Sequence, residues 1–140
     1  MVVFQDGGDA WAARFQAMGA TVDRTPWTAG DLAATLRTLA PDVVFCLIGI
    51  TRAGARREGR ASGRTPTYDT VDYGLTAMLV DATVAAGLRP RFVYLSAMGT
   101  GPGAATAYGR ARHRAEEAVR ASGLPFTIAR PGLISGPDRD

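Results

Sequence analysis

The sequence predicts an α/β fold in which a mostly parallel, doubly wound sheet is covered by helices. Apolar runs alternate with amphipathic stretches from one end of the chain to the other. The gaps between them are short and contain glycine or proline, which end helices and strands. Segments that alternate in this way are joined by right-handed crossovers, and the resulting sheet is parallel and covered on both faces.

The first half of the chain contains the less regular elements. The apolar run Val2–Gln5 predicts a strand, and the amphipathic stretch Asp9–Met18 predicts a helix that Gly19 ends. A short strand is expected near Ala20–Asp23, followed by a helix near Gly30–Leu39.

The middle of the chain begins with the longest apolar run, Val43–Ile50, which predicts a buried strand. The stretch from Arg52 to Thr67 is rich in arginine, glycine and alanine, and we interpret it as a loop. A helix is expected over Val71–Ala86, because Gly87 follows it directly.

The last third repeats the pattern of strand, helix and strand. The run Arg91–Ser96 predicts a strand next to Val43–Ile50, and Thr106–Ser122 predicts a helix that Gly123 ends. The final strand is Phe126–Arg130. The 140 residues fit one domain, and we find no repeat and no linker that divides them.

Composition excludes several classes of protein. A hydrophobic content of 46% with 21% charged residues is typical of a soluble globular domain. No apolar run approaches ~20 residues, and the start of the chain lacks the basic region of a signal peptide, so we expect a cytoplasmic protein without a membrane partner. A net charge of +3 is too small to indicate nucleic-acid binding. The single cysteine, Cys46, is expected to be a buried thiol, and His113 a surface residue without metal-ligand spacing.

The most informative motif is the pair formed by Tyr108 and Arg112. Residues four apart on a helix share one face, so the cation can lower the pKa of the phenol towards a range useful for proton transfer. Two plainer interpretations stay open. Tyr108 can be a half-buried tyrosine beside a solvated arginine, and Arg112 can form a surface ion pair with Glu116.

The surroundings of this pair resemble the short-chain dehydrogenase/reductase superfamily, in its atypical NmrA-like and epimerase-like branch. In that superfamily a Tyr-x-x-x-Lys helix follows a strand that ends in two serines, whereas here Ser96-Ala97 precedes Tyr108 and Arg112. The late strand ends in Arg-Pro-Gly at position 132, as in the branch named. The resemblance implies a Rossmann-like domain that binds NAD or NADP and exchanges hydride with a carbonyl or alcohol carbon of a small molecule.

The resemblance also implies catalytic roles. Tyr108 would donate or accept the proton, and Arg112 stands where the superfamily has the lysine that also binds the nicotinamide ribose. The serine that usually holds the substrate oxygen is replaced by Ala97, so Ser96 either takes its place or only bonds the adjacent backbone.

Residues at the carboxyl ends of the strands are the candidates for cofactor contacts, because ligands of a doubly wound sheet bind there. They are Asp6, Gly49, Thr51, Arg52, Pro131 and Gly132. Asp6 either accepts hydrogen bonds from the adenosine ribose or forms a turn before two glycines. Pro131 and Gly132 resemble the turn that packs against the nicotinamide. A further group of arginines either grips a phosphate or is simply solvated: Arg52, Arg56, Arg57, Arg60 and Arg64.

One expected motif is absent from the sequence. The superfamily has a Gly-x-x-Gly-x-x-Gly turn after its first strand, whereas here the glycine after Gly7-Gly8 is Gly19. Val2–Gln5 therefore corresponds to the second strand, and we expect the chain to be truncated at both ends and to bind NAD or NADP weakly. A natural minimal domain that pairs Val2–Gln5 directly with Val43–Ile50 is the alternative.

Two functions follow from these observations. The first is an NAD(P)-dependent oxidoreductase or epimerase-type enzyme that acts on a small molecule, which Tyr108 favours. The second is a catalytically inactive dinucleotide-sensing or protein-binding module, which Ala97 and Arg112 favour. The identity of the substrate and the oligomeric state do not follow from the sequence.

Overall fold

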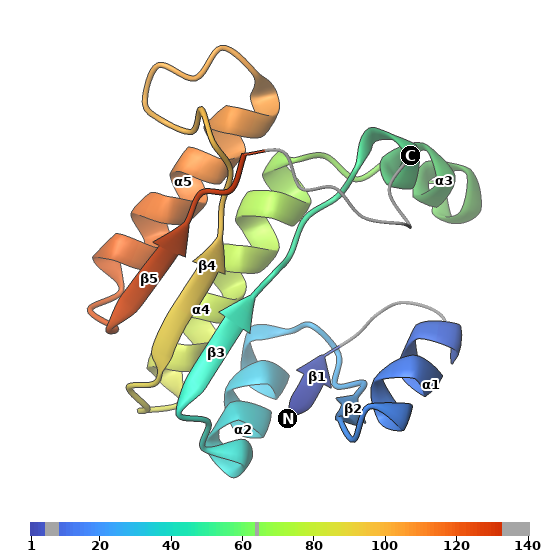
Figure 1. The fold of residues 1–140 in the computed structure, drawn as a ribbon, viewed down its shortest axis with the longest axis vertical. Helices are drawn as coiled ribbons and strands as arrows, with labels where there is room; N and C mark the ends of the chain where they lie inside the picture. Colours follow the sequence, from blue (N-terminus) through green and yellow to red (C-terminus); the bar gives the residue numbers. More distant parts are fainter. Residues whose placement is uncertain (5–8, 64, 133–140) are drawn as a thin grey trace.

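The computed structural model describes residues 1–4, 9–63 and 65–132 as strands and helices in regular alternation (Figure 1). In chain order the elements are β1 (Val2–Phe4), α1 (Asp9–Ala17), β2 (Thr21–Asp23), α2 (Ala29–Leu39), β3 (Val43–Cys46), α3 (Arg52–Ser62), the π-helical segment η1 (Asp69–Leu75), α4 (Thr76–Ala85), β4 (Arg91–Leu95), α5 (Ala107–Ala121) and β5 (Phe126–Ala129). None of the helices in this part of the chain is long and apolar enough to cross a membrane.

The strands form two parallel sheets. β1 pairs with β2, and β4 lies between β3 and β5 in the second sheet. Val43 is opposite Arg91 and Phe92 is opposite Phe126, which confirms that Val43–Ile50 and Arg91–Ser96 supply adjacent parallel strands. The alternative in which the first strand pairs with β3 is wrong, because β1 pairs with β2 among the described residues. β1 and β3 are therefore not neighbours in either sheet of the described residues.

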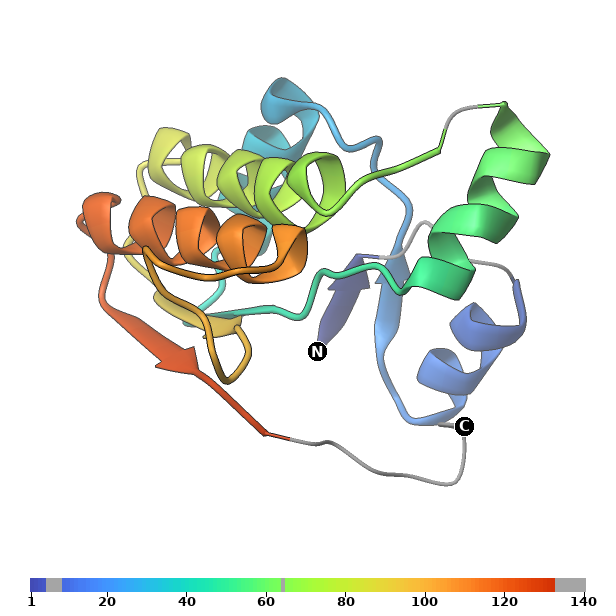
Figure 2. The same cartoon turned by 90° about the horizontal axis from the view of Figure 1, so that it is seen from above.

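The core lies between the larger sheet and the helices α2, α4 and α5, which cover one of its faces (Figure 2). The pleat alternates the side chains of β4, so Phe92 and Tyr94 point into this layer and are fully buried. They pack with Leu32, Leu36 and other apolar side chains of the three helices. Cys46 joins this core as the expected buried thiol.

Among the described residues no helix packs on the opposite face of the larger sheet, which corrects the expectation of a sheet covered on both faces. Helix α1 packs against β2 in the smaller sheet instead. The side chains of Phe45 in β3 and of Leu47 just after it are therefore 66% and 65% exposed.

The predicted loop between Arg52 and Thr67 is wrong, because most of it is helix α3. The Thr51 hydroxyl caps the helix by accepting a hydrogen bond from the Gly54 N–H, and Gly63 ends it in a left-handed conformation at φ 72°. Arginine, alanine and glutamate between the glycines are strong helix formers. These caps and propensities outweigh the glycines, which cost about 1 kcal/mol each in a helix.

Candidate functional site

The carboxyl ends of β3, β4 and β5 meet at one edge of the larger sheet. Pairing between β4 and β5 continues past both strands, because the Ser96 N–H donates to Ala129 O at 2.7 Å and the Met98 N–H donates to Pro131 O at 3.0 Å. Gly132 then lies beside the Met98 side chain. Three of the predicted site residues, Ser96, Pro131 and Gly132, are thus brought to the same edge.

Ser96 is engaged by a buried carboxylate on α5. Its hydroxyl donates to Glu116 Oε1 at 2.6 Å, and the residue is only 4% exposed. This corrects the expectation that Ser96, if not catalytic, only bonds the adjacent backbone. Because the Glu116 carboxylate is removed from water, it requires hydrogen-bond donors from the protein, and the Ser96 hydroxyl is one of them.

Glu116 also accepts hydrogen bonds from two arginines at the edge of the sheet. Arg130 donates through Nε to Oε1 at 2.8 Å and through Nη2 to Oε2, and Arg120 donates to Oε2 at 3.1 Å. Burial alone would raise the pKa of Glu116, but the hydrogen bonds from Arg130, Ser96 and Arg120 lower that pKa to about 2. Glu116 is therefore ionised at neutral pH and holds these donors together.

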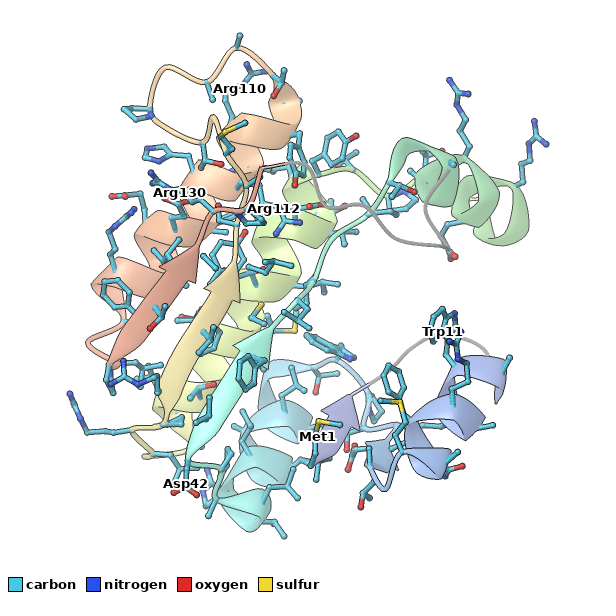
Figure 3. The ribbon with its side chains drawn as sticks, in the orientation of Figure 1. Met1, Trp11, Asp42, Arg110, Arg112 and Arg130 are labelled. Atoms are coloured by element: carbon cyan, nitrogen blue, oxygen red, sulfur yellow. The ribbon has the colours of Figure 1, made fainter. Side chains whose placement is uncertain are left out.

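The Arg112 side chain, labelled in Figure 3, is buried and contacts Asp72 and Leu95. Arg112 is only 7% exposed. Its Nη1 donates to Leu95 O at 2.7 Å and to the Tyr94 hydroxyl at 3.2 Å. Its Nη2 lies 2.9 Å from Asp72 Oδ1. The interpretation of Arg112 as a surface partner of Glu116 is therefore wrong. A guanidinium buried to this degree requires a counter-charge, and the fully buried Asp72 on η1 supplies it.

The Arg112–Asp72 pair is incompletely satisfied. Asp72 Oδ1 is in ion-pair contact without hydrogen-bond alignment, and Arg112 Nε has no hydrogen-bond partner among the residues that the structure describes. Burial raises the pKa of Asp72 even though the Arg112 guanidinium acts to lower it. Sequence reasoning missed Asp72, although an acidic residue inside the apolar stretch from Val71 to Ala86 was a signal that it has a buried partner.

Tyr108 lies near Arg112 on the face that the spacing predicts. The Arg112 Cζ atom is 5.2 Å from the centroid of the Tyr108 ring, a cation–π distance. The half-buried ring also meets Tyr68 edge to face at 5.3 Å between centroids. His113, the next residue after Arg112, is half-buried rather than a fully exposed surface residue.

The loop after β3 is built around the Arg112–Asp72 pair. A Cβ atom at Gly49 would lie 2.4 Å from Arg112 Nη2, so a side chain at this position would displace the guanidinium from its buried contacts. The Ile50 N–H donates to Asp72 Oδ2 at 3.3 Å. Thr51 and Arg52 follow as the cap and the first residue of α3. The predicted site residues Asp6 and Arg64 lie outside the described residues.

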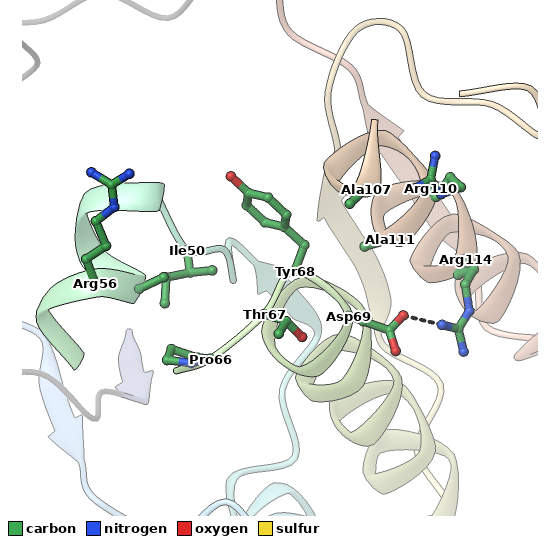
Figure 4. Close-up of a pocket in the computed structure, with 11 residues that line it drawn as sticks. Ile50, Arg56, Pro66, Thr67, Tyr68, Asp69, Ala107, Arg110, Ala111 and Arg114 are labelled. Carbon is green, nitrogen blue, oxygen red and sulfur yellow. Dashed lines mark hydrogen bonds and ion pairs between the residues drawn. The ribbon is translucent and has the colours of Figure 1, made fainter. Parts of the chain in front are cut away.

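A pocket of about 570 Å³ lies between α3, the segment before η1 and the first half of α5 (Figure 4). Its lining residues are Ile50, Ala55, Arg56, Pro66, Thr67, Tyr68, Asp69, Ala107, Arg110, Ala111 and Arg114. Only Arg56 of these was singled out from the sequence. Tyr68 connects the pocket to Tyr108 through the contact of their rings.

Comparison with known proteins identifies the family. Residues 14–139 match the model of a family described as NAD(P)H-binding. The chain belongs to this NAD(P)H-binding family. The resemblance seen in the sequence is thereby confirmed.

Two fungal proteins are related to this NAD(P)H-binding chain. It is 32% identical over 115 residues to the protein fmp52-1, mitochondrial, of Aspergillus terreus, a match that covers 81% of this chain and 45% of that protein. It is 34% identical over 100 residues to the protein fmp52, mitochondrial, of Aspergillus niger, covering 71% of this chain and 39% of that protein. The chain therefore spans less than half the length of these relatives.

Solved structures with the same fold include a UDP-glucuronic acid 4-epimerase mutant from Bacillus cereus, in complex with NAD and a substrate analogue. The TM-score is 0.62 at 19% identity, with 92% of this chain and 47% of that chain covered. RMD from Pseudomonas aeruginosa, complexed with NADPH, gives a TM-score of 0.59 at 22% identity, with 99% and 55% covered. These similarities confirm the Rossmann-like α/β fold.

The described residues of this NAD(P)H-binding chain include part of the edge at which a doubly wound sheet binds its ligand. At the edge that joins Ser96 to Pro131 and Gly132, paired backbone lies beside a glycine without a side chain. In residues 1–4, 9–63 and 65–132 no helix begins at a Gly-x-x-Gly-x-x-Gly turn. A pyrophosphate bound here would therefore lack the backbone donors of that turn.

Proposed function

We propose that the protein is an NAD(P)-dependent oxidoreductase or epimerase-type enzyme that acts on a carbonyl, alcohol or sugar-like small molecule. The observation that carries this proposal is the position of Tyr108 beside the Arg112 guanidinium, on the helix next to the carboxyl edge of the sheet. When bound, the nicotinamide supplies or accepts the hydride.

In this proposal Tyr108 holds and moves a proton at its phenolic oxygen. The positive charge of Arg112 lies beside the ring, and Asp72 offsets part of that charge. Ser96 acts as a positioning residue, since its hydroxyl is bonded to Glu116 and fixes the edge next to Pro131. Pro131 and Gly132 would hold the nicotinamide end of the cofactor, whether NAD or NADP.

A second candidate is a regulatory module that binds the dinucleotide without catalysis. It is favoured by the engagement of both Ser96 and Arg112 in contacts within the protein, because neither side chain is free to bind substrate or ribose in this arrangement.

Tyr108→Phe decides between the two candidates. We expect it to reduce the consumption of NADH or NADPH with a panel of aldehydes, ketones and nucleotide sugars by ~100-fold or more, the usual contribution of a positioned general acid. The dissociation constant of the cofactor should be unchanged, because the phenol contributes only to proton transfer. Tyr73→Phe is the matched control, since Tyr73 is also a half-buried tyrosine on the helical layer, stacked under Arg114. Equal turnover in Tyr108→Phe and the parent chain would contradict the enzyme and favour the module.

A further inference from the structure

The pocket between α3, the segment 66–69 and α5 has the size of a small-molecule site, which ranges from ~300 to ~1,000 Å³. At about 570 Å³ it takes a molecule of one or two rings. We propose that it binds a small anion with an apolar body and, resting on the proposed function, that this anion is the substrate.

The net positive charge of the lining residues favours an anionic ligand. Three arginines face one carboxylate, and the carboxylate, Asp69, is already paired with Arg114, which stacks on the Tyr73 ring at 3.8 Å. Arg110 donates through Nη1 to Ala105 O at 2.9 Å and to Ala104 O at 3.3 Å, which are neutral acceptors and leave its charge uncompensated. Arg56, an exposed side chain, adds a further guanidinium to the lining. A guanidinium forms paired hydrogen bonds with a carboxylate or a phosphate.

The apolar side chains that line the pocket favour a ligand with an apolar body. The side chains of Ile50, Ala55 and Pro66 form one side, and Ala107 with Ala111 forms the other. The two alanines on α5 leave room where longer side chains would fill the pocket. Figure 4 shows the Tyr68 ring projecting between α3 and α5, where a planar group can stack on it.

The position of the pocket connects it to the proposed proton donor. Tyr68 lines the pocket and meets the Tyr108 ring at 5.3 Å, so one aromatic ring separates an anchored ligand from Tyr108. Pro131 and Gly132, the candidate residues for the nicotinamide end, do not line it. An anion held by Arg56 and Arg110 is thus beside the catalytic helix and away from the cofactor edge.

The test uses phenyl phosphate as the probe, with inorganic phosphate and phenol as its separate halves. Isotope-labelled full chain is titrated without cofactor, and the resonances of Ile50, Ala107 and Ala111 are followed. We expect phenyl phosphate to shift these resonances and to bind at least ~10-fold more tightly than either half, because only it combines the charge-assisted bonds with apolar burial.

Variants separate the pocket from general attraction to a basic protein. Arg56→Gln is expected to weaken phenyl phosphate by ~10-fold, the value of one charge-assisted bond, and Arg110→Gln to do the same. Arg89→Gln is the matched control: Arg89 is exposed, donates to Gly123 O at 2.8 Å and is not a lining residue. Ala107→Leu should exclude phenyl phosphate and retain inorganic phosphate.

The outcomes keep the two proposals apart. Absence of phenyl phosphate binding, or equal weakening by Arg56→Gln and Arg89→Gln, overturns the pocket. Displacement of phenyl phosphate by NADPH overturns the assignment to substrate and gives the pocket to a cofactor phosphate. Binding of phenyl phosphate that depends on Arg56, together with equal turnover of Tyr108→Phe and the parent, supports the pocket while contradicting the enzyme.

Discussion

Two buried charge clusters lie one turn apart on α5, and their buried charges are compensated in different ways. At Arg112 a buried cation is matched by one buried carboxylate, Asp72, whose pKa is raised by burial. At Glu116 a buried carboxylate receives donors from Ser96, Arg120 and Arg130, and its pKa falls to about 2. The first cluster is thus under-satisfied and the second is fully bonded.

The two clusters differ in how far water shares their charge. Arg130 and Arg120 are 44% and 39% exposed in their side chains, so water shares the charge of the Glu116 cluster. Arg112 and Asp72 have side chains that are 8% and 0% exposed, so each depends on the other. Each cluster also engages one residue that the sequence assigned to catalysis, Arg112 in the first and Ser96 in the second.

The largest expected effect comes from removing Asp72. Asp72→Ala leaves the guanidinium of Arg112 buried without a counter-charge, which should cost about 3–5 kcal/mol in the free energy of unfolding. Urea denaturation followed by circular dichroism measures it. Asp69→Ala is the control, because Asp69 pairs with Arg114 on the surface and should cost less than ~1 kcal/mol. Equal losses of unfolding free energy in the two variants would show that the buried pair contributes no more to stability than the surface pair.

A smaller effect is expected from the protonation of Glu116. The folded-state pKa, about 2, is below the ordinary value of 4.5, so the stabilisation is present above pH 4.5 and is lost as the pH falls towards 2. The loss should be on the order of 1–3 kcal/mol, since exposed arginines share the charge with water. Glu116→Gln should flatten this part of the curve of unfolding free energy against pH. An unchanged slope in that variant would place the acid sensitivity on other carboxylates.

Local signals predicted the helices that carry the site. The predicted helix Thr106–Ser122 is observed as Ala107–Ala121, because its amphipathic pattern coincides with a Thr106 cap. Helix α3 was missed because its glycines suggested a loop, although Thr51 and Gly63 cap it.

Local sequence patterns do not predict contacts between segments that are far apart in the sequence. Arg112 and Asp72 are 40 residues apart in the sequence, so their pairing depends on how η1 packs against α5. The same holds for Ser96 and Glu116, where spacing identified the serine but not the carboxylate that binds its hydroxyl.

We propose that the carboxyl edge of the larger sheet holds the nicotinamide end of a dinucleotide. Titration of the isotope-labelled chain with NADH and NADPH tests it most directly. We expect weak binding, on the order of millimolar, because the described residues lack the glycine turn, and we expect shifts at Ala97, Met98 and Gly132. Micromolar binding, or shifts confined to the pocket beside Arg56, would contradict this placement.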